Sequence, residues 1–342
     1  MRRGWKRWVQ FAAGLALAIA VAWTAGPMFS GWKRSKLRPG WLLVRPPHEV
    51  SAILIPGGAE GRREVVWAGG RDGLSRIDCG SGALLPNPEG TGRFGRVRAL
   101  LREAKGNVIV AHGTGIAVCT DGACRVIPAP DGAWLALLQR RDGTLLAAGE
   151  AGLAQLRDGS FRLTDDVKKL GVKDPDVLYE DSTGRLWVGS SDPAVGGLLE
   201  GAPGVDWRRI HTNGQFPHPS VSMVLEERGG GVWFATGFGR AGGAVQWLNG
   251  DWKTLTKADG LAGEKARTLY QDRGGRLWIG SEYDGIVYRV GGGFRRLTPD
   301  DGLAGWEVKA MAEDSQGNYW MGTEDGITRM PPLGGTAPGG SE

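Results

Sequence analysis

Short runs in which apolar and polar residues alternate recur along the chain and predict β-strands. Residues 266–272 read Ala-Arg-Thr-Leu-Tyr-Gln-Asp and have a period of two, which is typical of a strand with one buried face. Asp272 is followed three residues later by Gly275, which predicts a tight turn in which the carboxylate accepts backbone N–H groups and the glycine adopts a positive φ. Further strands are predicted at residues 277–280, 285–289 and 294–297. This stretch therefore predicts four short antiparallel strands.

The same unit repeats through most of the chain. Residues 181–189, 272–280 and 314–322 share the pattern D-x-x-G-x-[LY]-W-x-G, and residues 227–235 are a fourth copy that opens with Glu and ends with Ala. Weaker copies precede them at residues 65–69, 106–111 and 143–148. The Trp position recurs every 37 to 46 residues and is occupied by Trp67, Ile109, Leu146, Trp187, Trp233, Trp278 and Trp320. We expect the five Trp residues to be structural and to fill the space between neighbouring units.

Seven such units predict an all-β fold, a seven-bladed β-propeller of four-stranded antiparallel blades. One sheet of this size cannot bury both of its faces, whereas sheets stacked around an axis cover one another. Residues 41–330 provide about 41 residues per unit, a usual blade length. The last unit ends at Met330 without a fourth strand, and we expect residues 41–45 to supply it, to close the ring and to protect its edge.

The repeated string resembles the two-component regulator propeller repeat, strongly in the last four copies and less in the first three. This family supplies the extracytoplasmic sensory propellers of bacterial hybrid sensor histidine kinases and also occurs as free-standing chains. The resemblance implies a seven-bladed propeller outside the cytoplasm that senses or binds something. Only residues 331–342, a Pro- and Gly-rich tail that we expect to be flexible, follow the last unit. Signalling would therefore need a separate partner that carries the kinase.

The first 40 residues differ from the rest in charge and hydropathy. Residues 1–7 are basic, residues 8–29 carry no charge, and residues 30–40 form a basic juxtamembrane linker. A helix of these 22 uncharged residues spans about 33 Å, enough for the hydrocarbon core of a bilayer, so we expect a transmembrane anchor. The alternative is a cleaved signal peptide, with residues 20–22, Ala-Val-Ala, as its cleavage site.

The charge distribution argues against a nucleic-acid partner. The chain has 42 basic and 37 acidic residues, a formal net charge of +5. Residues 1–38 hold eight of the basic residues and none of the acidic ones, so the remainder has 34 basic and 37 acidic residues. Binding to a phosphate backbone needs clustered Lys and Arg in excess over acids. We therefore expect no nucleic acid among the partners.

The cysteines indicate the compartment. Cys119 and Cys124 flank an Asp-Gly turn, where the side chains of paired strands could approach disulfide distance, and Cys79 is left over as a buried thiol. A disulfide fits an exported protein.

The basic residues are balanced on the two sides of residues 8–29, so they do not set the membrane orientation. We expect a bacterial inner-membrane protein with its propeller in the periplasm or outside the cell, or a secreted protein if the N-terminal segment is cleaved.

No arrangement of residues in the sequence predicts a catalytic, cofactor-binding or metal site. Residues 237–242 have the G-x-G-x-x-G spacing of a dinucleotide fingerprint, but they lie between two predicted strands and so indicate a glycine-rich loop. None of the four His residues pairs with a Cys at metal-ligand spacing. We expect a protein that is not an enzyme. The alternative enzyme is similar to streptogramin lyases and would need His and carboxylate residues around a divalent ion, but only His112 lies in a candidate within-blade loop.

The loop face around the central channel is the expected binding surface, because irregular segments of all blades converge there. Exposed aromatic and Arg residues on a rigid ring are typical of a recognition surface. The candidate ligand- or partner-binding residues are Phe216, His218, Phe238, Arg240, Tyr283 and Trp306. We expect a membrane-tethered binding or sensory module that recognises a protein partner, a glycan or a small ligand and acts through a separate signalling partner. The second alternative is a scaffold for an envelope assembly.

Overall fold

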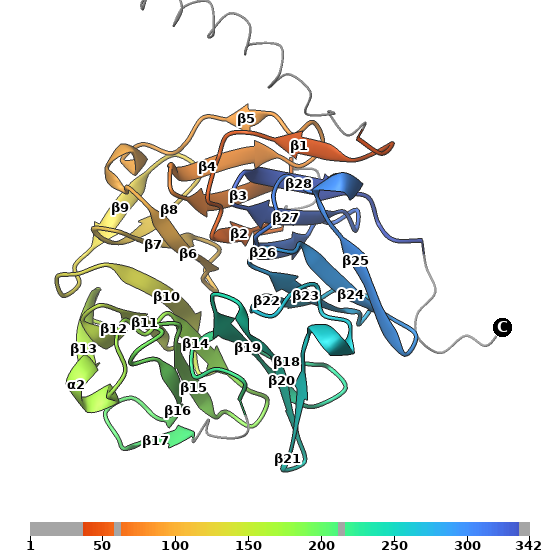
Figure 1. Ribbon diagram of the computed structural model, residues 1–342. Helices are drawn as coiled ribbons and strands as arrows, with labels where there is room; N and C mark the ends of the chain where they lie inside the picture. The colour runs from red at the N-terminus through yellow and green to blue at the C-terminus, as the bar shows by residue number, and fades with distance from the viewer. Residues whose placement is uncertain (1–36, 58–62, 211–215, 335–342) are drawn as a thin grey trace, which may run out of the picture. The chain divides into compact units, whose positions relative to one another are not determined.

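The computed structural model describes residues 37–57, 63–210 and 216–334. In these residues, seven four-stranded antiparallel sheets are arranged as blades around an axis, and the first strand of each blade contacts the first strands of its two neighbours (Figure 1). The predicted seven-bladed propeller is confirmed, and the fold is nearly all-β. The anchor or signal peptide expected at residues 8–29 lies outside the described residues.

The first four blades take their strands in chain order. Blade one consists of β2 (Ala52–Leu54), β3 (Val65–Gly70), β4 (Gly73–Asp78) and β5 (Leu84–Leu85). Blade two consists of β6 (Val97–Arg102), β7 (Val108–His112), β8 (Gly115–Cys119) and β9 (Cys124–Ile127). Blade three consists of β10 (Trp134–Gln139), β11 (Leu145–Gly149), β12 (Gly152–Arg157) and β13 (Ser160–Asp166). Blade four consists of β14 (Val177–Glu180), β15 (Leu186–Ser190), β16 (Gly197–Gly201) and β17 (Trp207–Ile210).

The last blade takes its outer strand from the start of the propeller. Blade five consists of β18 (Val221–Glu226), β19 (Val232–Phe238), β20 (Ala241–Leu248) and β21 (Asp251–Leu255). Blade six consists of β22 (Ala266–Gln271), β23 (Leu277–Ser281), β24 (Ile286–Val290) and β25 (Gly293–Leu297). Blade seven consists of β26 (Val308–Glu313), β27 (Tyr319–Thr323), β28 (Gly326–Met330) and β1 (Leu42–Val44). The short helices are η1 (Thr91–Arg93), α2 (Val167–Leu170), η2 (Lys257–Asp259) and η3 (Pro299–Asp301).

Strand β1 closes the ring. It precedes blade one in the chain, yet it pairs with β28 as the outermost strand of blade seven, with Leu42 opposite Arg329 and Val44 opposite Ile327. On the inner side, β2 of blade one contacts β26 of blade seven. The two ends of the propeller are therefore joined within one sheet, and the edge of β28 is covered.

The repeated Trp residues are buried where neighbouring blades meet. Trp187, Trp233, Trp278 and Trp320 are at most 1% exposed, and Trp67 is 3% exposed. Each belongs to a core cluster that includes residues of the next blade. The structural role expected for these side chains agrees with this burial, because a large aromatic ring fills the wedge between two sheets.

The acid that opens each strong repeat holds the Trp in place. Asp181 Oδ2 accepts a hydrogen bond from Trp187 Nε1 at 2.9 Å, and its Oδ1 accepts one from the backbone N–H of Arg185 at 3.0 Å. Burial would raise the pKa of Asp181, but hydrogen bonds from Thr183, Trp187 and Arg185 outweigh it, so the pKa is lowered. The indole-to-carboxylate bond recurs in three further pairs, Trp278 with Asp272, Trp320 with Asp314 and Trp233 with Glu227.

The two cysteines of blade two are joined. Cys119 and Cys124 lie opposite each other on β8 and β9 and form a disulfide, with their Cα atoms 4.0 Å apart. Cys79 is free and buried. Burial, with smaller contributions from Glu64 and Asp314, raises the pKa of the Cys79 thiol to about 12. This thiol therefore stays protonated at neutral pH.

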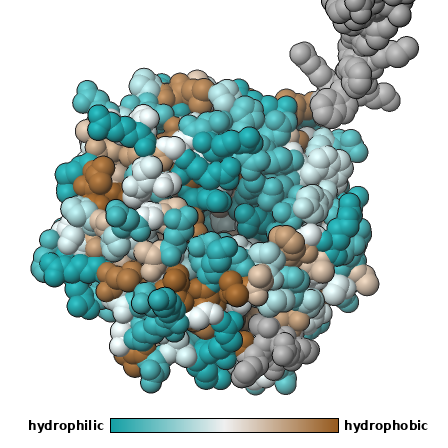
Figure 2. Space-filling view, turned by 60° about the vertical axis from the view of Figure 1, so that its left-hand side comes forward, coloured by the Kyte–Doolittle hydropathy of each residue, from teal (hydrophilic) through white to brown (hydrophobic). Residues whose placement is uncertain are grey.

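The described surface is mainly hydrophilic in the view of Figure 2, where hydrophobic residues lie in small groups. Scattered apolar side chains of this kind are normal on proteins that face water. Within the part of the chain that the structure describes, no helix has the length and apolar composition that a membrane span requires.

Candidate functional site

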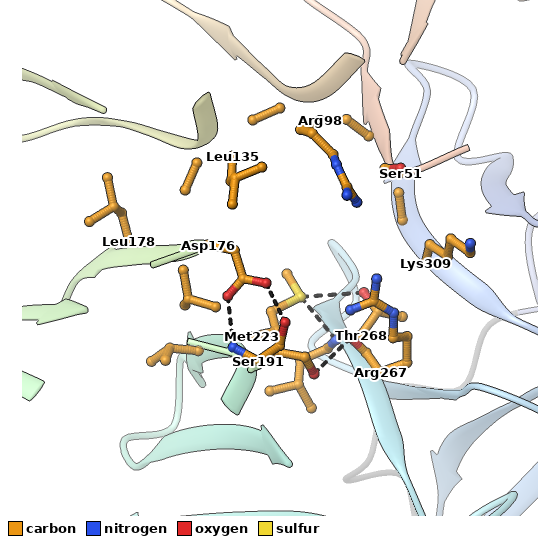
Figure 3. A pocket seen from close by; sticks show the side chains of 18 of the residues that line it. Ser51, Arg98, Leu135, Asp176, Leu178, Ser191, Met223, Arg267, Thr268 and Lys309 are labelled. Carbon is orange, nitrogen blue, oxygen red and sulfur yellow. Dashed lines mark hydrogen bonds between the residues drawn. The ribbon is translucent and has the colours of Figure 1, made fainter. Parts of the chain in front are cut away.

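A cavity of about 660 Å³ lies between the innermost strands of the blades (Figure 3). Its walls come from every blade, through residues of or next to β2, β6, β10, β14, β18, β22 and β26. The volume is in the range of small-molecule sites, about 300–1,000 Å³. The centre of the ring is therefore large enough to hold a small organic molecule.

Each innermost strand contributes one side chain at an equivalent position of this wall. In five blades the pairing with the second strand shifts near its start, as between Val97 and Ala99, where Arg98 is inserted. An insertion of this kind redirects a side chain. In blades one and four, Ser51 and Asp176 directly precede the first paired residue of their strands. We call the seven cavity-lining residues at this position the channel ring, namely Ser51, Arg98, Leu135, Asp176, Ser222, Arg267 and Lys309.

Two cations of the channel ring have carboxylate partners. Arg267 Nε donates to Glu307 Oε1 at 3.1 Å. Lys309 Nζ lies 2.9 Å from Glu307 Oε2 and also pairs with Glu49. Only 8% of the Lys309 side chain is exposed, so its charge is balanced almost entirely within the protein.

Arg98 is the cation of the channel ring without such a partner. It is half-buried and extends into the cavity (Figure 3). Among the described residues, none forms a hydrogen bond or an ion pair with its guanidinium. Loss of hydration, together with the nearby charges of Arg96 and Arg267, lowers the pKa of Arg98, and the more distant carboxylates of Asp176 and Glu49 oppose this shift only in part. Because an arginine stays protonated in proteins, the channel holds a positive charge that no neighbouring carboxylate contacts.

Asp176 lies on another wall of the cavity, in blade four (Figure 3). Its Oδ1 accepts a hydrogen bond from the backbone N–H of Ser191 at 3.0 Å, and its Oδ2 accepts one from the Ser191 hydroxyl. Burial raises the pKa of Asp176, although Ser191 and the charges of Arg267 and Arg98 oppose the shift. A carboxyl group that keeps its proton to higher pH can donate a hydrogen bond as well as accept one.

Apolar side chains separate these polar groups. Leu135, Leu178, Met223 and Met311 line the cavity. The Met223 sulfur also accepts a hydrogen bond from the Thr268 hydroxyl at 3.3 Å, which ties blade five to blade six. The site can therefore take a molecule that has both a charged group and an apolar surface.

Phe216 is not on the loop face, contrary to the expectation from the sequence. Its side chain is only 8% exposed. It packs against Phe234 and Trp252, with ring centres 5.5 and 5.4 Å apart. The connection between blades four and five turns this ring into the core, because burial against two other aromatic rings is more favourable than exposure to water.

The other five candidates lie on hairpins and connections of blades five to seven, outside the cavity lining. We call them the loop-face patch, namely His218, Phe238, Arg240, Tyr283 and Trp306. Phe238, Tyr283 and Trp306 are 52%, 50% and 44% exposed. The Arg240 guanidinium lies 6.0 Å from the centre of the Tyr283 ring, and the rings of His218 and Phe238 stack with centres 6.3 Å apart. The Trp306 carbonyl accepts the Gly285 N–H at 2.9 Å, which ties its loop to that of Tyr283.

Residues 237–242, the string with dinucleotide-like spacing, form the hairpin between β19 and β20. Gly237 pairs with Gly242 across this hairpin, and Arg240 lies in its turn. The fingerprint would require a helix after the string, and a strand follows instead. The string is therefore a hairpin loop and not a dinucleotide site.

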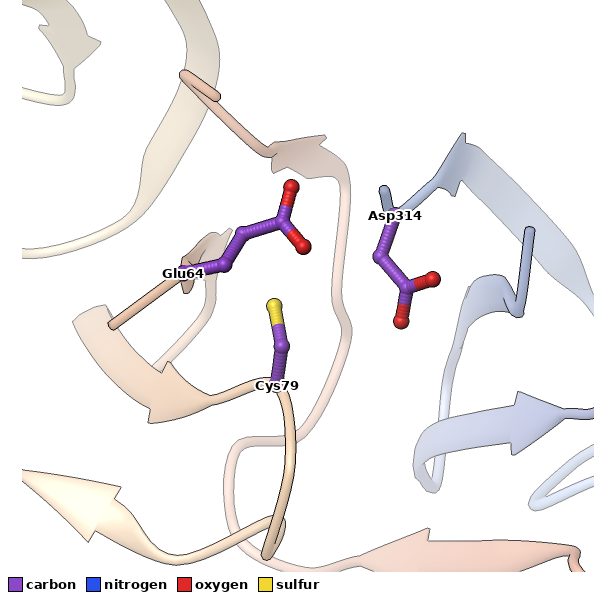
Figure 4. Close-up of side chains that lie close together, drawn as sticks. All are labelled: Glu64, Cys79 and Asp314. Carbon is purple, nitrogen blue, oxygen red and sulfur yellow. The ribbon is translucent and has the colours of Figure 1, made fainter. Parts of the chain in front are cut away.

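Glu64, Cys79 and Asp314 gather where blade seven meets blade one (Figure 4). Their potential ligand atoms lie within 4.8 Å of one another. Both carboxylates already have protein donors, since Glu64 accepts the backbone N–H of Ser315 at 3.0 Å and Asp314 accepts the indole N–H of Trp320 at 2.9 Å. We therefore assign this group to the packing between the two blades.

The histidines that the structure describes lie outside the cavity lining. His112 is 3% exposed and stacks on Phe94 with ring centres 4.4 Å apart, and burial lowers its pKa. His48 Nδ1 lies 3.1 Å from Asp72 on the surface. The lyase-like alternative would need His112 on a loop of the inner channel, and the burial of this side chain at the end of β7 does not favour that alternative.

The channel ring was not among the residues predicted from the sequence, although the sequence contains a signal for it. Arg267 precedes Trp278 by eleven residues, and the same spacing separates the ring residue from the Trp position in five other blades. In blade one the spacing is sixteen residues, from Ser51 to Trp67. Aligning the copies at the Trp position would have shown a polar or charged residue eleven positions upstream in five of six copies.

Comparison with a known family supports the repeat. The model of the family described as two component regulator propeller matches residues 260–283 and 305–325, which include the first two strands of blades six and seven. The resemblance indicated by the sequence motif is thus confirmed, and the chain carries this repeat. No protein with a curated description matches the chain in sequence.

Solved structures share the propeller at low sequence identity. The extracellular domain of BT3049 from B. thetaiotaomicron, described as a hybrid two component system, is 17% identical, with a TM-score of 0.73 over 87% of this chain and 42% of that one. An inactive virginiamycin B lyase from Staphylococcus aureus with quinupristin is 16% identical, with a TM-score of 0.63 over 84% of this chain and 97% of that one. PorZ of the Porphyromonas gingivalis type-IX secretion system is 12% identical, with a TM-score of 0.58 over 84% and 47%. These matches establish the fold alone, and the chain spans less than half of the BT3049 domain.

Proposed function

We propose that the chain is an extracytoplasmic binding or sensory propeller that recognises a ligand or a protein partner and acts through a separate signalling partner. The observation that carries the proposal is the cavity lined by all seven blades, with charged and apolar side chains on its walls. The repeat shared with two component regulators and the fold shared with an extracellular sensory domain support it.

An extracytoplasmic location is part of this proposal. The disulfide between Cys119 and Cys124 supports it, because such bonds persist in oxidising compartments. Residues 8–29 would tether the propeller to the inner membrane through the linker of residues 30–40, or would be removed as a signal peptide.

The location can be tested with reporter fusions to the full chain. Alkaline phosphatase folds only in an oxidising compartment, so a fusion at the C-terminus should be active, whereas a β-galactosidase fusion at the same place should be inactive. A fusion that deletes residues 8–29 is the control and should reverse both results. An active β-galactosidase fusion to the full chain would refute the proposed location.

The loop-face patch is the proposed contact for a protein partner or a glycan. Exposed aromatic rings and an Arg on neighbouring loops are the residue types enriched at binding hot spots. The full chain with Tyr283→Ala and Trp306→Ala should lose the partner that the unaltered chain captures after crosslinking in cells. The matched control is Val126→Ala with Val205→Ala, which truncates two exposed apolar residues of other blades. Unchanged capture by the Tyr283 and Trp306 double variant would contradict this role.

A further inference from the structure

We infer that the cavity is a binding site for a small organic molecule with one carboxylate, which Arg98 holds against an apolar wall. This inference rests on the proposed function, because it names the class of ligand that the binding propeller takes. It places that ligand in the channel, away from the loop-face patch, so the two sites can be tested separately.

The acidic side chains of the cavity already have partners within the protein. Asp174 and Asp192 share Lys173, whose Nζ lies 3.8 Å from Asp174 Oδ2 and 3.1 Å from Asp192 Oδ2. Asp176 accepts two hydrogen bonds from Ser191. A cationic ligand would therefore have to compete with contacts that are already made.

The basic side chains are paired with one exception. Glu307 contacts both Arg267 and Lys309, and Glu49 contacts Lys309 as well. Arg98 is the one charged lining residue for which no described residue supplies an ion pair or hydrogen bond. One unmatched positive charge fits one negative charge on the ligand, whereas a dianion such as a phosphate monoester would bring a second charge without a partner.

The chemistry of Arg98 favours a carboxylate. A guanidinium presents its N–H groups in a planar fork that matches the two oxygens of a carboxylate. Arg98 is half-buried, so water competes less for these bonds than it does at an exposed arginine. Asp176 and Glu49 act on this charge only from beyond ion-pair distance, so a ligand carboxylate would supply the direct partner that the partly desolvated guanidinium lacks.

The rest of the cavity indicates the body of the ligand. Leu135, Leu178 and Met223 offer an apolar wall, and the volume of about 660 Å³ admits a ligand of drug-like size at most. These side chains would gain from covering an aliphatic or aromatic body. The expected ligand is therefore an apolar carboxylic acid and not a small polar acid.

The test measures binding to the full chain purified in detergent. Calorimetry uses three probes, benzoate, 3-phenylpropionate and hexanoate, and their uncharged amides as comparators, with inorganic phosphate as the dianion. The variants are Arg98→Met, Arg98→Lys and, as the matched control, Arg125→Met, which removes an exposed arginine from β9 of the same blade.

We expect at least one carboxylate to bind the unaltered chain and the Arg125→Met control equally. Arg98→Met should weaken this binding by about 10- to 100-fold, the range for loss of a charge-assisted hydrogen bond, and the amides should bind about tenfold or more weakly than their acids. Arg98→Lys should lie between, because it keeps the charge and loses the fork. The Arg98→Met chain should fold normally, since the variant removes a guanidinium that makes no hydrogen bond or ion pair with the described residues and keeps an apolar side chain of similar length.

Three results would overturn the inference. The first is that Arg98→Met and the unaltered chain bind the carboxylates with equal affinity. The second is that an amide or phosphate binds as tightly as the carboxylates. The third is that none of the three carboxylates binds. In each case, capture of a partner through the loop-face patch would leave the proposed function standing. If the Tyr283 and Trp306 double variant still captures the partner while the carboxylates bind the unaltered chain, the binding role of the loop-face patch is refuted and the channel site stands.

Discussion

Removal of the Trp278 ring is the perturbation whose cost follows most directly from the structure. Trp278 is fully buried between blades six and seven. Its ring centre lies 4.6 Å from that of Tyr288 and 4.8 Å from that of Tyr319, and its indole N–H donates to Asp272 Oδ2 at 3.1 Å. Trp278→Ala therefore opens a cavity between two blades and takes a donor from a buried carboxylate.

The size of the effect can be worked out from these contacts. Truncation of a buried Trp to Ala costs about 3–5 kcal/mol of unfolding free energy. The Asp272 carboxylate keeps the Tyr319 hydroxyl as a donor at 2.9 Å, so the lost indole bond adds only about 1 kcal/mol or less. Trp278→Phe keeps most of the ring volume and loses the N–H, and it should cost about 1–2 kcal/mol.

Equilibrium unfolding in urea, followed by circular dichroism, measures these differences. Trp306→Ala is the matched control, because the same truncation at a side chain that is 44% exposed should change the unfolding free energy by about 0.5 kcal/mol or less. The expected order of stability is unaltered chain, Trp306→Ala, Trp278→Phe and Trp278→Ala. If the unfolding free energy of Trp278→Ala is within about 1 kcal/mol of that of the unaltered chain, the Trp278 ring does not stabilise the contact between the blades.

Three further predictions follow from the fold. Deletion of residues 39–46 removes β1, so calorimetry should show a markedly lower melting temperature, and an unchanged transition would show that the strand does not close the ring. Under non-reducing conditions, an alkylating reagent should modify only Cys79, and only after unfolding, as read by mass spectrometry. The reason is that Cys119 and Cys124 are bonded to each other and that burial raises the pKa of the Cys79 thiol to about 12. Modification of all three cysteines would contradict this prediction. The pKa of Asp181 is lowered from 3.8 in the folded chain, so the carboxylate stabilises the fold above that pH, and this stabilisation is lost as the pH falls through the lower folded value. Asp181→Asn should therefore reduce the loss of unfolding free energy at acid pH, measured by urea unfolding at a series of pH values. The same acid dependence in the variant and the unaltered chain would refute the assignment.

The repeat and its blade Trp residues could be found in the sequence because their causes are local. A period of two, an Asp-x-x-Gly turn and a Trp two positions before a glycine act within about ten residues, so each copy can be identified by itself. The weak copies show the limit of this approach. Blade three has Leu146 at the Trp position and buries Trp134 of its innermost strand instead, which no comparison at the Trp position could indicate.

The candidate site was harder to predict because exposure depends on distant residues. The residues around Phe216 in the sequence have the composition of a surface loop, which predicted an exposed ring. In the structure the ring is covered by Phe234 and Trp252, which lie on two strands of the next blade. Tyr283 and Trp306 were correctly expected on exposed loops, because short hairpins of a propeller face solvent. Their role in binding stays a prediction.

The pattern of residues along the chain was sufficient to establish that it forms seven antiparallel blades, because hydrophobic alternation and turn chemistry are written into each short segment. Closure of the ring then placed side chains as distant as Ser51 and Lys309 around one cavity. Whether a charged member of the ring, such as Lys309 or Arg98, has a carboxylate partner depends on which strands become neighbours. The unpaired charge of the half-buried Arg98 is therefore a property of the assembled propeller, and its own segment of the sequence does not reveal it.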